Sequence, residues 1–380
     1  MVSYCPTNRG YRRALRAVMC CAAVLWQAAC TRVPAADSTP KELMRMESAP
    51  PLASAETPHA VLAEGGDSAT RAEFHNVYFH MTPDVVLRIR YLRGAMVATS
   101  SGQPVVFDNK SSFVIDIDSA QVGLTPTNLE HLMNGYVFAY RGAPLRKLRF
   151  SVDGEKLVQS GIMHKVVDIP FQITAALSIT PEGRIRIHPT AIQIFDVDGM
   201  GLMKALGITL DRLLDLRKAK GVTVDGNDLL LKPDSLLPPP AIAGRVVAVR
   251  VAGGEVVQVF GDSPRASANN QRPLAPLDSS AANYMRFMGG TLRFGKLFMV
   301  QADMQIIDSD PRDPFDFSID DYNRQLVAGY SKNTPAGGLK VYMPDLEDAL
   351  TTGFRGQGSG GKGTDRGQGA ARGAERSTLR

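Results

Sequence analysis

"FMVQADMQI", residues 298–306, places an apolar side chain at every second position. Side chains alternate across a β-strand, so this spacing predicts a strand of about ten residues with one apolar face. The same alternation recurs at 87–91, 113–118, 148–152, 184–188 and 247–251. "VDGN" (224–227) and "AGGE" (252–255) have the composition of hairpin turns. Because polar residues fill the alternate positions, the pattern predicts antiparallel sheets with one face in water.

One stretch departs from this pattern: "GMGLMKALGITLDRLLDLRKAKG", residues 199–221. Leucines recur in it at three- and four-residue steps, which predicts a long amphipathic helix that Asp198 could cap and Gly221 could end. A shorter helix is expected at "TPTNLEHLMNG" (125–135), with Thr125 as its cap and Pro126 in its first turn.

The distribution of charge along the chain bears on whether the partner is a nucleic acid. The formal charge of the 380 residues is +5, but residues 1–29 carry +4 and residues 351–380 carry another +4, so the remainder carries −3. The folded part is therefore slightly acidic and has no basic patch with interleaved aromatic residues, which argues against a nucleic-acid partner.

The first thirty residues have the pattern of a bacterial export signal. Four arginines without any acid precede the apolar stretch "AVMCCAAVLWQAA" (17–29). "QAAC" (27–30) is similar to a lipobox, in which the cysteine becomes the lipidated first residue, although Gln27 replaces the usual aliphatic residue. The alternative is ordinary cleavage within "VPAAD" (33–37), which would remove Cys30. All four cysteines lie in residues 1–30, so the remaining chain can form no disulfide.

Catalytic and metal-binding signatures are weak. The sequence contains no G-x-S-x-G or H-E-x-x-H motif, and His75 and His80 are spaced so that a strand would point them to opposite faces. Acidic residues are dense between Asp303 and Asp321, and three of them are weak calcium candidates: Asp308, Asp310 and Asp313. Their spacing does not match an EF-hand. We therefore expect neither catalysis nor a resident metal or other cofactor.

The order of elements resembles that of a known group of proteins. "LRGAMVATSSGQPVVFDNKSSFVIDIDSAQVGLTPTNLEHLMN" (92–134), "EGRIRIHP" (182–189) and "LLLKPDSLLPPPAIAGRVVAVRVAGGEVVQVFG" (229–261), with the leucine-rich stretch between the last two, are similar to bacterial LmeA-type lipid-binding proteins. These belong to the TULIP (tubular lipid-binding, BPI-like) superfamily. The resemblance implies an α+β fold in which a highly curved antiparallel sheet wraps around one long amphipathic helix, with an acyl chain held between them.

Composition and resemblance together divide the chain. We expect a signal peptide (1–29), a disordered tether (30–72), a TULIP-like lipid-binding domain (73–262), a linker or long loop (263–282), additional strands packed on that domain (283–345) and a disordered tail (346–380). Pro-, Ala- and Gly-rich composition without periodicity marks the terminal segments.

The expected function is non-catalytic binding or carriage of an acyl or membrane lipid in an apolar groove. The candidate groove residues are Leu202, Leu206, Leu210, Leu213, Leu214, Val249 and Met304. Lipidated Cys30 would anchor the protein on the periplasmic side of the envelope, at the outer membrane because Thr31 rather than Asp follows it. The alternative is a scaffold lipoprotein with a filled core and an exposed apolar patch that binds an envelope protein.

Overall fold

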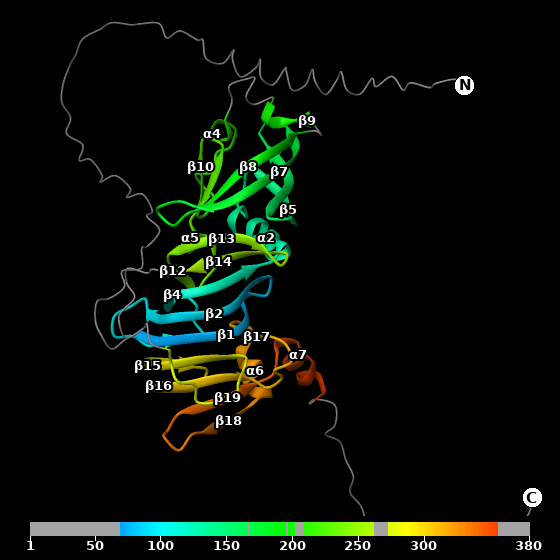
Figure 1. Ribbon diagram of the computed structural model, residues 1–380. Coiled ribbons are helices and arrows are strands. Elements are labelled where there is room, and N and C mark those ends of the chain that lie inside the picture. The colour runs from blue at the N-terminus through cyan, green and yellow to red at the C-terminus, as the bar shows by residue number, and fades with distance from the viewer. Residues whose placement is uncertain (1–68, 166, 195–196, 202–208, 262–272, 356–380) are drawn as a thin grey trace, which may run out of the picture. The chain divides into compact units, whose positions relative to one another are not determined.

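The computed structural model describes residues 69–165, 167–194, 197–201, 209–261 and 273–355. All of them belong to one compact unit, Pro58–Arg380. Most of the described chain forms strands of two large sheets, joined by short helices (Figure 1). Within the described part of the chain, no helix has the length and apolar character needed to span a bilayer.

Twelve strands form the larger sheet, in the order β13-β14-β4-β2-β1-β15-β16-β19-β18. Three short strands pair in parallel beside this path, β12 with β4, β17 with β1 and β3 with β15. Figure 1 shows β4, β2, β1, β15, β16, β19 and β18 as successive bands. The bounds are β1 (Ala69–Thr82), β2 (Val85–Ala98), β3 (Val105–Val106), β4 (Phe113–Leu124), β12 (Ala241–Gly244), β13 (Val246–Ala252), β14 (Glu255–Phe260), β15 (Tyr284–Phe294), β16 (Leu297–Asp308), β17 (Phe315–Ser318), β18 (Tyr330–Asn333) and β19 (Leu339–Met343).

Aromatic side chains fill much of the core of this sheet. Phe107 lies at the centre of the group, and its ring centroid is 5.0–5.8 Å from those of Phe113, Phe287, Phe294 and Tyr322. Further ring pairs, Phe74 with Phe79, Phe79 with Phe317 and Phe315 with Phe317, extend the cluster. Large rigid rings in edge-to-face and tilted pairs leave little empty volume between them.

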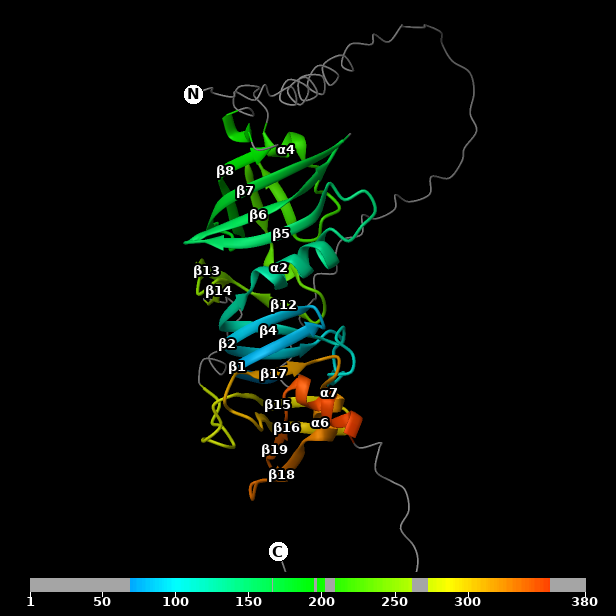
Figure 2. The ribbon, with the colours of Figure 1, turned by 90° about the vertical axis from the view of Figure 1, so that its right-hand side faces the viewer.

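Seven strands form the second sheet, in the order β10-β11-β8-β7-β6-β5, with β9 beside β8. Its main hairpins join neighbours in the chain, and Figure 2 shows β5, β6, β7 and β8 side by side. A bulge at Lys147, whose φ is 51°, shifts the register of β5. The bounds are β5 (Leu145–Asp153), β6 (Lys156–His164), β7 (Asp168–Ile179), β8 (Ile185–Ile194), β9 (Val197–Asp198), β10 (Val222–Asp225) and β11 (Asp228–Leu231).

The short helix expected from Thr125 is confirmed. The hydroxyl of Thr125 accepts a hydrogen bond from the amide of Asn128 (3.1 Å), and Pro126 starts α2. Instead of ending at Gly135, the helix continues as the π-helix η1. α2 contacts both β5 and β2, so it packs against both sheets (Figure 2). The helices are α2 (Pro126–Leu132), η1 (Met133–Val137), α4 (Leu210–Leu213), α5 (Pro233–Leu236), α6 (Tyr322–Ala328) and α7 (Leu346–Arg355).

The predicted fold class, a curved sheet wrapped around one long helix, is wrong. The described residues form two large sheets with short helices, and α4 is the only helix between Thr209 and Gly221. Thr209 and Leu214, at its two ends, have extended backbone angles. The hairpin at 225–228 competes for this backbone, since Asn227 Oδ1 accepts from Leu210 N and the carbonyl of Gly226 accepts from Asp211 N (both 3.1 Å). Residues 199–201 are helical, but around Leu210 and Asp211 tertiary hydrogen bonds therefore override the helical leucine spacing.

Several other expectations concern residues outside the described part of the chain. The expected signal peptide, most of the tether, and the candidates Cys30, Leu202 and Leu206 lie there. Where the chain is described, β1 begins at Ala69 within the segment expected to be tether. Likewise α7 occupies the start of the expected tail.

Candidate functional site

An apolar cavity of about 70 Å³, which we call the central cavity, lies where the two sheets and α2 meet. Strands β5, β6, β7, β8, β10 and β11 contribute one wall, and α2, η1, α5, β14, the end of β4 and connecting segments contribute the rest. The lining comprises Leu124, Leu129, Leu132, Met133, Phe138, Leu145, Phe150, Leu157, Gln159, Leu177, Ile185, Ile187, Leu216, Val222, Leu229, Leu231, Pro233, Leu236, Leu237, Val256 and Gln258.

Two smaller apolar cavities adjoin the central cavity. The first, of about 30 Å³, lies on the seven-stranded sheet and shares Leu145, Gln159 and Leu229 with the central lining; we call it the upper cavity. The second, of about 20 Å³, lies in the twelve-stranded sheet and shares Leu237 and Gln258; we call it the lower cavity. The central cavity therefore shares lining side chains with both of its neighbours, and the three cavities form one apolar series.

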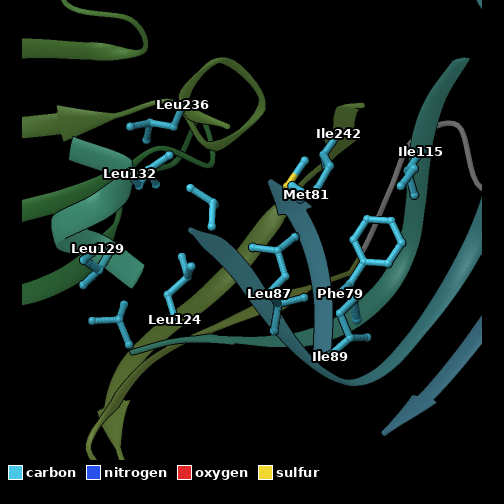
Figure 3. Close-up of a cluster of buried hydrophobic side chains, with 14 of the residues drawn as sticks. Phe79, Met81, Leu87, Ile89, Ile115, Leu124, Leu129, Leu132, Leu236 and Ile242 are labelled. Atoms are coloured by element: carbon cyan, nitrogen blue, oxygen red, sulfur yellow. The ribbon is translucent and has the colours of Figure 1, made fainter. Parts of the chain in front are cut away.

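Figure 3 shows the junction between the central and lower cavities. Leu124, Leu129, Leu132 and Leu236 belong to the lining of the central cavity. Beside them in the figure stand side chains that line the lower cavity, namely Phe79, Leu87, Ile89, Ile115 and Ile242. β1, β2, β4 and β12 carry the residues of the lower cavity, whereas those of the central cavity come from the end of β4, from α2 and from α5. Leucine and isoleucine dominate both groups, in contrast to the aromatic cluster.

Each cavity is smaller than the engineered apolar cavity of about 150 Å³ that admits benzene. A long ligand could enter only if the lining side chains moved apart. The lining presents no charged group to an apolar ligand, because none of the residues around the three cavities is ionisable. Its only polar members are Gln159 and Gln258. Side-chain amides are unusual components of a wall that is otherwise apolar.

A polar hollow of about 450 Å³ opens on the surface beside this series. It shares Leu214 with the upper cavity, and Leu216 and Val222 with the central cavity. Lys165, Asp211, Arg212, Asp215 and Arg217 line the rest of it. The side chain of Lys165 donates to the carbonyls of Arg212 (3.1 Å) and Leu213 (3.3 Å), and Arg217 pairs with Asp215. A surface recess with charged side chains thus shares lining residues with the apolar interior.

The predicted groove residues separate into two groups. Leu210, Leu213 and Leu214 all line the upper cavity, although they reach it from α4 and the extended residue after it. Val249 is half-buried beside Gln258 on the neighbouring strand but lines none of the three cavities. Met304 is buried in the twelve-stranded sheet opposite Phe287 and is also absent from the three linings. Alternation predicted which face these two side chains occupy, but not which part of the core.

The calcium candidates have protein partners. Asp308 is buried and accepts from Asn283 Nδ2 (3.0 Å) and from the amide of Asp310 (2.8 Å), while Asp310 pairs with Arg312. Asp313 accepts from Asn283 through its backbone carbonyl. Burial raises the pKa of Asp308. Among the described residues, no group of three or more His, Cys, Asp or Glu side chains is arranged to hold a metal ion.

Three of the five described histidines pair with carboxylates, whereas His131 hydrogen-bonds the backbone carbonyl of Asp84 and His75 stacks on Tyr284. His80 Nε2 lies 2.5 Å from Asp316, His164 lies 2.6 Å from Asp168, and His188 lies 2.7 Å from Asp228. In the described residues, none of these pairs hydrogen-bonds a serine, threonine or cysteine side chain. They therefore act as structural ion pairs or hydrogen bonds.

Exposed apolar side chains gather near one end of β16. Phe298 is 61% and Val300 is 68% exposed, whereas Ala302 and Met304 on the same strand are buried. Gln301, whose φ is 51°, interrupts the alternation between the two pairs. Exposure of this kind is what the scaffold alternative predicts.

Comparison with protein-family models, with curated proteins and with solved structures finds no match to this chain.

Proposed function

We propose that the protein binds an acyl lipid in the apolar series formed by the upper, central and lower cavities, and that it holds this lipid without turning it over. The observation that carries the proposal is the continuity of the three linings, which consist of aliphatic and aromatic residues and two glutamines. Hydrocarbon is the ligand class that such a wall recognises, because it leaves no charge to be compensated.

The energetics favour a long chain over a small apolar molecule. Burial of hydrocarbon contributes about 0.8 kcal/mol per CH₂, so about sixteen carbons gain on the order of 10 kcal/mol. That gain must exceed the free-energy cost of moving apart the side chains that line the cavities. The leucine and isoleucine side chains of the lining can make this room by changing rotamer.

The polar hollow supports a route into the interior. Its shared residues, Leu214, Leu216 and Val222, separate it from the upper and central cavities. A lipid entering there would keep its polar end among Lys165, Asp215 and Arg217 while its chain crossed the leucine barrier.

A cavity-filling variant tests the proposal. Val256→Phe places a ring in the central cavity, whereas Val247→Phe adds the same ring at an exposed position of β13. Each protein is purified gently and extracted with solvent, and the extract is measured by mass spectrometry. We expect stoichiometric acyl lipid with the parent protein and with Val247→Phe, and a large loss with Val256→Phe. Equal lipid in both variants, or none in the parent protein, would contradict the proposal.

We further propose that the chain is exported and anchored to the envelope through lipidated Cys30. The arginine-led signal and the "QAAC" sequence support this. Cells labelled with palmitate should yield labelled protein in the membrane fraction, and Cys30→Ser should remove both the label and the membrane association. Label retained by Cys30→Ser would show that the anchor lies elsewhere.

A further inference from the structure

The two polar residues in the cavity walls occupy equivalent places. Gln159 belongs to the walls of both the upper and the central cavity, and Gln258 belongs to the walls of both the central and the lower cavity. Each junction between neighbouring cavities therefore carries one side-chain amide. No other polar side chain lines any of the three.

Gln159 faces inward because of its position on β6. Leu157 and Met163, which are two and four residues away, share its face and line the same cavities. Its neighbours across the sheet are Phe150 on β5 and Ile173 on β7, and both also line cavities. Gln159 itself is only 7% exposed. It thus lies within an apolar surface, not at its edge.

The amide of Gln159 has no protein partner in the described part of the chain. No described side chain or backbone group hydrogen-bonds it, and the same is true of the half-buried amide of Gln258. A side-chain amide offers two donors and an acceptor. Neither amide is among the fully enclosed side-chain atoms that lack a partner, so each keeps some accessible surface and is available to a hydrogen-bonding group of a ligand.

Charge decides which group this can be. A carboxylate or phosphate placed at the junction would be buried without a cation, because none of the three linings contains lysine, arginine or histidine. An uncharged carbonyl oxygen has no such penalty and can accept from the amide nitrogen. Since apolar cavities lie on both sides of the junction, the carbonyl must have hydrocarbon on both sides.

We propose that Gln159 donates a hydrogen bond to the carbonyl of an internal carboxylic ester, whose two hydrocarbon arms extend into the upper and central cavities. The ligand class is then an ester with apolar chains on each side, rather than a free fatty acid or a plain hydrocarbon. Gln258 offers the same interaction to a carbonyl at the second junction. This inference rests on the proposed function and specifies the ligand of the same site.

The test compares three probes on the intact protein: oleyl oleate, an alkene hydrocarbon of similar length, and oleic acid. We expect the ester to bind about tenfold more tightly than the hydrocarbon. Gln159→Leu should lose about this factor for the ester and nothing for the hydrocarbon, because a neutral hydrogen bond contributes about one factor of ten. Gln172→Leu, an exposed position on neighbouring β7, should bind all three probes as the parent does.

A spectroscopic measurement separates a hydrogen bond from a packing effect. The infrared band of a ¹³C-labelled ester carbonyl should shift to lower frequency in the parent protein and return to its hydrocarbon-solvent position in Gln159→Leu. Gln159→Met serves if the leucine variant does not fold. An unshifted band in the parent, or equal affinity for ester and hydrocarbon, would overturn the inference and leave lipid binding intact. Failure of all three probes to bind would instead overturn the proposed function.

Discussion

The two sheets are filled in different ways. Around β1, β15 and β17, aromatic rings pack against one another, as Phe107 does against Phe287 and Phe79 against Phe317. Around the central cavity only Phe138 and Phe150 are aromatic, and the other apolar residues are mostly leucine, isoleucine and valine. Apolar side chains are buried in both regions. The difference shows that burial alone does not describe a core, because the shape of the side chains decides how closely they pack.

Truncation of one ring in each region should separate the two kinds of core most strongly. Phe107→Ala removes a buried ring with four aromatic neighbours, so we expect a loss of about 3–5 kcal/mol in the free energy of unfolding. Phe150→Ala enlarges an existing cavity and should cost about 1–2 kcal/mol less. Urea unfolding of both variants measures this. Equal losses would show that the central cavity is as tightly packed as the aromatic cluster.

Loss of the N-cap of α2 should increase local opening around the central cavity and not in the aromatic cluster. Thr125→Ala removes the hydrogen bond to Asn128 N and should cost about 1 kcal/mol. Because α2 lines the central cavity, amides of 127–132 should then exchange hydrogen faster, while those of β15 should not. Thr125→Ser is the matched control and should retain most of the protection. Uniform acceleration in both regions would indicate that the two cores open together.

A pH-dependent prediction concerns the aromatic region. Burial, together with Asp308, Asp313 and Asp316 nearby, raises the pKa of Asp345 to about 7. The native state therefore favours the protonated form, and this contribution to stability is complete below pH 4 and is lost as the pH rises to 7. Asp345→Asn should stabilise the protein at pH 8, by less than about 1 kcal/mol because the group is partly exposed, and should change little at pH 4.

Thermal melts at both pH values provide the measurement. Asp310→Asn is the control of opposite sign, since the hydrogen bond from Arg312 lowers the pKa of Asp310. Its stabilising effect is present above its ordinary pKa and is lost in acid, so this variant should gain nothing at pH 8. A decrease in the melting temperature of Asp345→Asn at pH 8 would contradict the assignment.

Local patterns predicted local structure. The two hairpins at 224–227 and 252–255 form as expected, and Thr125 caps its helix. Period-two spacing identified strands such as β16, but the positive φ of Gln301 exposes Phe298, which the alternation placed on the buried face. Such signals depend only on neighbours in the chain, and they fail where a single backbone angle departs from the regular value.

Longer-range features could not be predicted in this way. The leucine spacing at 199–221 favoured a helix, but hydrogen bonds from the 225–228 hairpin decided the conformation around Leu210. Leu213 and Leu214 were nevertheless identified as cavity residues, because burial of leucine holds in either conformation. Gln159 was missed because a polar residue within a strand normally indicates a solvent-facing position. Only its cross-strand neighbours reveal that it faces inward.

The pairing of β1 has a consequence for the order in which the chain can fold during synthesis. β1 ends at Thr82, but its sheet partner β15 starts at Tyr284, about 200 residues later. At about 5–20 residues per second, β15 leaves the ribosome roughly 10–40 s after β1. The hairpins β5 to β8 need only consecutive residues and can form meanwhile. One edge of β1 therefore stays without β15 until late in translation, and a binding partner for nascent chains would have that interval in which to keep the chain unfolded.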